Sequence, residues 1–387
     1  MTTDLLIDEV RATAVAVPTT RTCAWAKGLS YGHTRTIVEI RTRGGLVGFG
    51  EAPTDKAAPI IEHRFAALMK GRLAMAVTEA RLACLGTHRD FGYLADSLGE
   101  MAYAAIDMAL WDLRAKAAGV PLYVYLGGAV RARAPFVAYA YTVDLADGFS
   151  ESEVPGIMAG IAKDSIAQTG AKMFEFKVGR HSVDCDIATV LEVRSAVGPD
   201  VDLAVDANLA MSMADARRFL YGVREARLAN VEEPVSSLAG MSILRRDFDI
   251  PISTHCTDIE KLRGYPLIDD IVGDINADGG LGPVVKLAAV ICSTGRRFWL
   301  RSNGETGIGF AVLCHLGMAL PELERPSQNL LNWCEDDLIL GPTWLTQDGG
   351  VRPPDSPGLG VELDRDALQH YSGLYRSRGA FSRYDAQ

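Results

Sequence analysis

The stretch VDLAVDAN, residues 201–208, decides the fold of this chain. Its length, β-branched residues and hydrophobicity predict a buried strand. The strand ends in a carboxylate, Asp206, and an amide, Asn208, lies two residues on, where a strand would present both side chains on one face. An apolar strand with an acidic carboxyl end is typical of the catalytic rim of a parallel α/β barrel. Asp206 could instead cap the next helix, but four later strand-like segments also end in a polar group.

Length and composition favour a soluble enzyme. The chain has 387 residues, enough for a barrel of about 250 residues and a smaller domain. The net charge of −10 argues against nucleic acid as the main partner. Seven cysteines without a CxxC pair indicate reduced thiols. Because we see neither a signal peptide nor an apolar run of about 20 residues, we expect a cytoplasmic protein that does not bind membranes.

The first 125 residues predict a small α+β domain. A loop at 18–30 appears irregular and long enough to be functional. Arg21, Tyr31 and His33 lie in or beside this loop, and they either serve the site or are simply solvated. A helical pattern then runs from 57 to 118. Strands are predicted at residues 4–17, 36–42 and 46–51.

After residue 126, strand-like and helix-like segments alternate, which predicts βα units and a parallel sheet. No glycine-rich dinucleotide fingerprint follows the first strand, so a closed barrel is favoured over an open sheet. We assign residues 126–345 to this barrel and expect residues 346–387 to pack back onto the first domain. Strands are predicted at 134–141, 173–178, 201–206, 229–232, 250–255, 271–275 and 297–301, and helices near 152–169, 183–196, 213–226 and 282–294.

Three polar residues end successive strands about one βα unit apart: Asp206, Glu232 and His255. They would therefore ring one rim of the barrel. Two carboxylates and a third ligand suit Mg²⁺. Histidine is a softer donor and would tilt the site toward manganese, iron or zinc, unless His255 is a core residue.

Two further strand ends carry charged side chains. Lys177 shares a strand face with Glu175, and a lysine inside a barrel is either a candidate base or half of an ion pair with that glutamate. Asp274 ends the sixth strand and Arg301 the seventh, with Asn303 two residues on. An Asp–Arg pair on adjacent strands is also a common structural bridge.

At this point the chain resembles the mandelate racemase and muconate-lactonising branch of the enolase superfamily, and most of all its glucarate dehydratase subgroup. The resemblance covers nearly the whole chain and rests on the order and spacing of its motifs. It implies an α/β fold, a modified (β/α)7β barrel with an N-terminal α+β capping domain at residues 1–125. The motifs are GFGEAP at 48–53, AIDMALWDLRAKAAGVPLYVYLGG at 105–128, EFKVG at 175–179, VDAN at 205–208, VEEP at 231–234, GDINADGG at 273–280 and PDSPGLGVELD at 354–364.

The resemblance also implies a magnesium-assisted removal of the proton alpha to a carboxylate, with the enediolate stabilised by the cation. Asp206 and Glu232 match two metal ligands of the family, and His255 falls at the third position. Lys177 matches the base on one face. Asp274 matches the aspartate that, in the family, holds a histidine base on the other face.

Two departures from the family pattern concern the bases. Glu175 replaces the first lysine of a Lys-x-Lys pair and would hold Lys177 as ammonium. Arg301 replaces the histidine and cannot accept a proton near neutral pH. The changes could be coupled, with Arg301 neutralising Glu175 or binding a substrate carboxylate.

We therefore expect a lyase that dehydrates an acid sugar. Lys177 would take the alpha proton, assisted by Asp274 and Arg301, while His33, Glu175, Asn208 and Asn303 contact substrate. The alternatives are a one-base isomerase or cycloisomerase, and an acid-sugar-binding homologue without activity. We expect a small carboxylate as ligand, no nucleic acid partner and a homo-oligomer.

Overall fold

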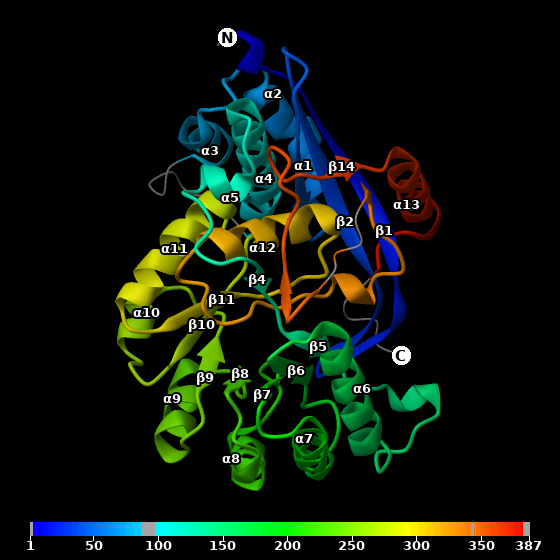
Figure 1. The fold of residues 1–387 in the computed structure, drawn as a ribbon, viewed down its shortest axis with the longest axis vertical. Helices are drawn as coiled ribbons and strands as arrows, with labels where there is room; N and C mark the ends of the chain where they lie inside the picture. The colour runs from blue at the N-terminus through cyan, green and yellow to red at the C-terminus, as the bar shows by residue number, and fades with distance from the viewer. Residues whose placement is uncertain (1–2, 87–96, 342–343, 345, 382–387) are drawn as a thin grey trace.

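The computed structural model describes residues 3–86, 97–341, 344 and 346–381. Within these residues an N-terminal antiparallel sheet and its helices lie beside a curled parallel sheet with helices on its outside (Figure 1). This is the predicted barrel with an α+β domain. The described helices include none that is long and apolar enough to span a membrane, and all seven cysteines are free thiols.

The N-terminal sheet has the strand order β1-β2-β3 and is covered by helix α4. Glycines 48 and 50 of the GFGEAP motif let the helix approach, because a Cβ at Gly50 would lie 1.9 Å from the carbonyl oxygen of Ala105. The predicted helical region 57–118 is interrupted after α2. The elements are η1 (Thr3–Leu5), β1 (Ile7–Trp25), β2 (Gly28–Thr42), β3 (Val47–Ala52), α1 (Ala57–Ile60), the π-helix η2 (Ile61–Phe65), α2 (Ala66–Met69), α3 (Val77–Leu85), α4 (Ser97–Ala118) and α5 (Leu122–Tyr125).

The predicted loop at 18–30 is wrong. β1 continues to Trp25 and β2 begins at Gly28, so these residues form a hairpin arm that reaches the barrel (Figure 1). Its register shifts between Pro18 and Cys23. Contacts from distant segments hold the arm extended, since Glu335 N donates to Pro18 O at 2.9 Å and Thr142 N donates to Ala24 O at 3.2 Å.

The barrel strands follow one another in space in chain order, and every pair is parallel. Residues 327–328 bridge the two ends of the sheet: Gln328 N donates to Leu300 O at 2.9 Å, and Val137 N donates to Ser327 O at 3.0 Å. The strands are β5 (Ala138–Ala140), β6 (Met173–Lys177), β7 (Asp202–Asp206), β8 (Asn230–Glu232), β9 (Ile252–Thr254), β10 (Asp270–Gly273) and β11 (Arg297–Leu300).

Helices follow each of these strands in the described chain, including three that the sequence pattern did not reveal: α9, α10 and α12. The predicted helix at 213–226 ends earlier, at Gly222, and a 3-10 turn follows it. The helical segments are η3 (Leu145–Asp147), α6 (Val154–Thr169), α7 (Val183–Val197), α8 (Met213–Gly222), η4 (Arg224–Ala226), α9 (Leu238–Asp247), α10 (Ile259–Arg263), α11 (Leu281–Ser293), α12 (Gly307–Ala319) and η5 (Leu331–Trp333).

The C-terminal segment contacts both parts of the molecule. Helix α13 packs on β1, and Leu359 N donates to Asp112 of α4 at 2.7 Å. Strand β13 pairs instead with β4. The boundaries at 125 and 345 stay a prediction. The remaining elements are β4 (Ala134–Pro135), β12 (Ile339–Leu340), β13 (Gly350–Val351), β14 (Glu362–Leu363) and α13 (Arg365–Arg378).

Candidate active site

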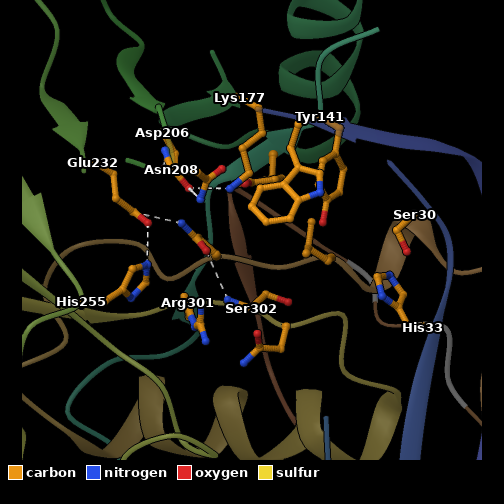
Figure 2. A pocket seen from close by; sticks show the side chains of 15 residues that line it. Ser30, His33, Tyr141, Lys177, Asp206, Asn208, Glu232, His255, Arg301 and Ser302 are labelled. Carbon is orange, nitrogen blue, oxygen red and sulfur yellow. Dashed lines mark hydrogen bonds and ion pairs between the residues drawn. The ribbon is translucent and has the colours of Figure 1, made fainter. Parts of the chain in front are cut away.

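The register of the parallel strands brings the predicted residues to one rim. Lys177 lies opposite Asp206, and Asp206 lies opposite Glu232. A cavity of about 210 Å³ opens at this rim, between the strand ends and the hairpin arm. Figure 2 shows Lys177 and Arg301 on opposite sides of it. The lining residues are Trp25, Ser30, His33, Tyr139, Tyr141, Lys177, Asp206, Asn208, Glu232, His255, Arg301, Ser302, Asn303, Gln328 and Leu330.

Lys177 forms an ion pair with Asp206 and not with Glu175. Its ammonium lies 5.8 Å from the ring centre of Tyr139 and 5.9 Å from that of Trp25. Burial by itself would raise the pKa of Asp206, but the ammonium of Lys177 outweighs it and lowers that pKa. Lys177 is thus held at the rim by one carboxylate and two aromatic faces.

The sequence analysis placed Asn208 on the same strand face as Asp206. In the structure β7 ends at Asp206, and the backbone is left-handed at Asn208, with φ 47°. The turn still brings the two side chains together. Asn208 donates its backbone N–H to Asp206 Oδ1 at 2.8 Å and its side-chain N–H to Oδ2 at 3.0 Å. The buried Oδ1 of Asn208 accepts no hydrogen bond from the residues that the structure describes.

His255 and Glu232 form the second pair of the rim. His255 Nε2 lies 2.9 Å from Glu232 Oε1, and Nδ1 lies 3.3 Å from the carbonyl oxygen of Val272. Burial raises the pKa of Glu232. Burial opposes charge on His255, but the Glu232 carboxylate outweighs it, so the pKa of His255 is raised. Each of the two groups therefore binds a proton at a higher pH than it would in water.

Arg301 forms an ion pair with Asp274, which is the structural bridge that the sequence analysis considered. Its Nε donates to Asp274 Oδ2 at 2.6 Å, and Asn303 Nδ2 donates to the same oxygen at 2.6 Å. Burial would raise the pKa of Asp274, but the guanidinium of Arg301 outweighs it and holds that pKa well below its usual range. Asp274 does not line the cavity; it orients two residues that do.

Glu175 does not line the cavity, and its predicted contact with substrate stays a prediction. Gln328 Nε2 donates to Glu175 Oε1 and reaches Glu232 Oε2 at 3.3 Å. Burial, together with repulsion from Glu232, raises the pKa of Glu175 to about 8.

The suggested coupling of Glu175 with Arg301 is also wrong. The cation nearest to Glu175 is Arg325, whose Nη2 lies 3.8 Å from Glu175 Oε2. Arg325 stacks on Trp299 with its guanidinium carbon 3.5 Å from the ring centre. The positive charge near Glu175 therefore comes from Arg325, just before the barrel-closing residues 327–328. Arg301 pairs with Asp274 instead.

Eight of the ten predicted residues line the cavity, and Glu175 and Asp274 lie behind it. Sequence reasoning missed Gln328 because no strand pattern marks the segment that closes the barrel. It missed Trp25 because the arm was taken for a loop. Of the other arm residues, Arg21 lies over the ring of Trp333 beside a separate cavity, and Tyr31 is exposed.

The donor chemistry of the rim fits a divalent cation. Asp206 and Glu232 are buried carboxylates on adjacent strands, and the amide oxygen of Asn208 beside them has no partner among the described residues. Hard oxygen donors of this kind suit Mg²⁺. No group of three acidic, histidine or cysteine side chains converges as a metal site within the described chain, because Lys177 engages Asp206 and His255 engages Glu232.

Two family models match the chain. Residues 9–127 match the model described as "Mandelate racemase / muconate lactonizing enzyme, N-terminal domain". Residues 158–367 match the model described as "Enolase C-terminal domain-like". Together they span the N-terminal domain and most of the barrel.

Curated relatives with different activities are similar to nearly the whole chain. A "Probable glucarate dehydratase" of Streptomyces coelicolor is 28% identical, over 95% of this chain and 91% of the relative. A "Chloromuconate cycloisomerase" of Pseudomonas putida is 27% identical, over 95% of this chain and 99% of the relative. At these identities the relatives indicate a family and leave the reaction open.

Solved structures share the fold. An enolase of Streptomyces coelicolor described as a putative sugar isomerase is 30% identical and superposes with a TM-score of 0.87, over 96% of this chain and 98% of that chain. An enolase of Gibberella zeae, complexed with magnesium, formate and sulfate, is 23% identical with a TM-score of 0.87, over 99% of this chain and 94% of that chain.

Proposed function

Because this chain belongs to the mandelate racemase / muconate lactonizing enzyme family of the enolase superfamily, we propose that it is a lyase that removes water from a hydroxylated sugar acid. The observation that carries the proposal is the placement of Lys177 at the cavity wall, opposite an Arg301 that Asp274 holds in place. This arrangement offers a base on one side of a bound acid and a fixed cation on the other.

The polar lining supports a hydroxylated ligand. Ser30 and His33 line the cavity from the arm, and Ser302, Asn303 and Gln328 line it from the barrel. Each of these side chains can donate or accept a hydrogen bond with a hydroxyl group. Ser30, Ser302, Asn303 and Gln328 already form hydrogen bonds within the protein, which hold these polar groups in place at the cavity wall.

Asp206 and Glu232 would hold a divalent cation, with His255 as the proposed third ligand. The cation would neutralise the negative charge that develops on the substrate carboxylate. As a metal ligand, Asp206 would be less available for its ion pair with Lys177. The amine of Lys177 would then stand beside the alpha carbon and accept its proton.

The remaining residues bind and orient. Arg301, kept charged and held by Asp274, faces the substrate as a fixed positive group. Asn208 and Asn303 would hydrogen-bond substrate hydroxyls. His33 on the arm would close the far side of the cavity and limit the entry of water. The beta hydroxyl would leave together with the proton that Lys177 has taken up, as one molecule of water, and this would complete the reaction.

A second candidate is an isomerase or cycloisomerase that uses Lys177 alone. The similarity to a chloromuconate cycloisomerase over almost its full length favours it. Such a reaction shares the proton abstraction by Lys177 and differs in what the enediolate does next. The polar lining of the cavity makes us place this candidate second.

The test is proton exchange in D₂O. We would incubate the protein with Mg²⁺ or Mn²⁺ and a panel of acid sugars, and follow both deuterium uptake at the alpha carbon and loss of water. We expect both for at least one acid, and only with the cation present. Lys177→Met should abolish exchange. The matched control is Lys172→Met, which removes an exposed lysine just before the start of the same strand.

Each other outcome points to a different function. Exchange without loss of water would replace the lyase by the isomerase. Binding of acid sugars without any exchange would mean a binding protein without activity. Exchange that survives in Lys177→Met would remove Lys177 as the base.

A further inference from the structure

The β6–α7 loop carries a charged residue, Arg180, that touches the tip of the hairpin arm. Arg180 Nη1 lies within hydrogen-bond distance of two carbonyl oxygens at the tip, 3.3 Å from Trp25 O and 3.5 Å from Gly28 O. Its Nη2 donates to Asp144 Oδ1 at 2.9 Å. One guanidinium thus joins the arm to two different loops of the barrel rim.

The backbone of the loop that carries Arg180 is held by its own hydrogen bonds. Gly179 has a left-handed backbone, with φ 85°, and its N–H donates to Asp186 Oδ2 at 2.7 Å. Ser182 caps helix α7 by accepting from Cys185 N. The loop therefore presents Arg180 from a firm position just after the strand that carries Lys177.

The contact bears on the site through Trp25. Its ring lines the cavity and lies 5.9 Å from the ammonium of Lys177. The arm itself contributes Ser30 and His33 to the same wall. A shift of the tip would move Trp25 away from Lys177 and open the cavity to solvent.

We infer that Arg180 is a positioning residue that latches the hairpin arm over the cavity, with Asp144 as its anchor. The Arg180 side chain is 22% exposed and Asp144 7%, so the pair is partly shielded from water and is stronger than an exposed ion pair. Its two carbonyl contacts add to the backbone hydrogen bonds from Thr142 to Ala24 and from Glu335 to Pro18. The latch itself is independent of the reaction; only its effect on turnover rests on the proposed function.

Trypsin cleavage after Lys27 measures the latch directly. Lys27 is exposed in the tight turn of the arm, and a protease needs the turn to open before it can cut. When opening is fast, the cleavage rate follows the open population. We expect Arg180→Ala to speed cleavage about tenfold and Arg180→Lys to be intermediate, because a lysine keeps the charge but loses the planar fork.

The matched control is Arg218→Ala, which removes an ion pair between helices α8 and α7 without touching the arm. If Arg180→Ala fails to fold, Asp144→Asn carries the test, with about threefold faster cleavage expected from a weakened anchor. Equal cleavage rates in the Arg180 or Asp144 variant and in the control would overturn the latch.

Turnover separates the latch from the proposed function. With an active substrate, Arg180→Ala should raise KM about tenfold and leave kcat within about twofold, because the Lys177 strand is untouched while the wall over the ligand is loosened. An unchanged KM would show that the arm does not depend on Arg180 during turnover and would overturn the positioning role. If no acid sugar is turned over by wild type but trypsin cleavage still responds to Arg180→Ala, the proposed function fails and the latch stands.

Discussion

Arg325 places a positive charge next to two buried carboxylates inside the barrel. Its side chain is 5% exposed and lies between two carboxylates, 3.8 Å from Glu175 Oε2 and 3.6 Å from Asp270 Oδ2. None of its three nitrogens makes a hydrogen bond within the described chain. Stacking on Trp299 compensates part of that loss. Ion pairs and stacking, and not hydrogen bonds, therefore hold the guanidinium in place.

Removing this cation should destabilise the barrel. We expect Arg325→Met to lower the free energy of unfolding by about 3 kcal/mol, because it leaves two buried carboxylates without their shared cation. Adding Glu175→Gln should restore part of the loss, since the buried charge is then removed. Urea unfolding of the single and double variants measures both effects.

A control for this prediction is Arg297→Met. Arg297 also pairs with Asp270, but its side chain is 53% exposed, so its loss should cost less. A larger loss for Arg297→Met than for Arg325→Met would contradict the role given to the buried cation.

At the scale of elements, helix α4 and strand β3 show how small residues set a distance. A Cβ at Gly48 would lie 2.2 Å from Ala109 O, and one at Gly50 would lie 1.9 Å from Ala105 O. Both atoms belong to the helix backbone, which cannot rotate away as a side chain can. The close contact buries the apolar face of α4 against the sheet and brings the Glu51 end of β3 to the barrel, where Glu51 accepts from Thr306 N at 2.9 Å.

Gly50→Ala should therefore push α4 off the sheet. We expect a loss of about 3 kcal/mol, the upper end of what overpacking costs. Gly156→Ala in helix α6 is the control, because its added methyl group meets no heavy atom within 4 Å, and we expect it to gain about 0.5 kcal/mol from helix propensity. Thermal melting compares the two, and a Gly50→Ala protein as stable as wild type would refute the packing argument.

At the scale of the whole molecule, His315 joins the barrel to the N-terminal domain and the C-terminal segment. On helix α12, its Nδ1 accepts from Tyr123 N at 3.2 Å and its Nε2 donates to Leu359 O at 3.1 Å. Burial lowers the pKa of His315 to about 4. A second proton would sit on Nδ1 and face the N–H of Tyr123, so the neutral ring is the one that fits.

This arrangement predicts an acid-sensitive junction. An unfolded histidine binds its proton near pH 6.5. Between pH 6.5 and 4 the unfolded state is therefore protonated while folded His315 is not, and stability falls as pH is lowered. The loss from this residue should reach about 2 to 3 kcal/mol at pH 4.5.

His315→Gln provides the comparison, because glutamine can accept from Tyr123 and donate to Leu359 without titrating. Urea unfolding at pH 7 and 4.5 should show a smaller loss for this variant than for wild type. Asp355, which accepts a hydrogen bond from Tyr123 at 2.8 Å, is present in both proteins and cancels in the comparison. Parallel pH dependence in the two proteins would show that His315 does not titrate in this way.

The parallel barrel, its capping domain and the rim that Lys177, Asp206 and Glu232 share could all be predicted from the sequence. These follow from local patterns: each strand is a short apolar run, and the polar residue at its carboxyl end must fall at the same edge of a parallel sheet. Helix α12 escaped detection for the opposite reason. All its residues are buried, so the periodic polar face that marks a helix is missing.

The hairpin arm, the wall that Gln328 forms and the pairing of Glu175 with Arg325 could not be predicted, because they depend on contacts made in the folded chain. The two strands of the arm pair with each other, and Thr142 and Glu335, far away in the chain, add hydrogen bonds to its backbone. Arg325 reaches Glu175 only after the barrel closes. Such contacts join segments that lie far apart in the chain, and no local pattern encodes them because their free energy appears only when both segments are in place.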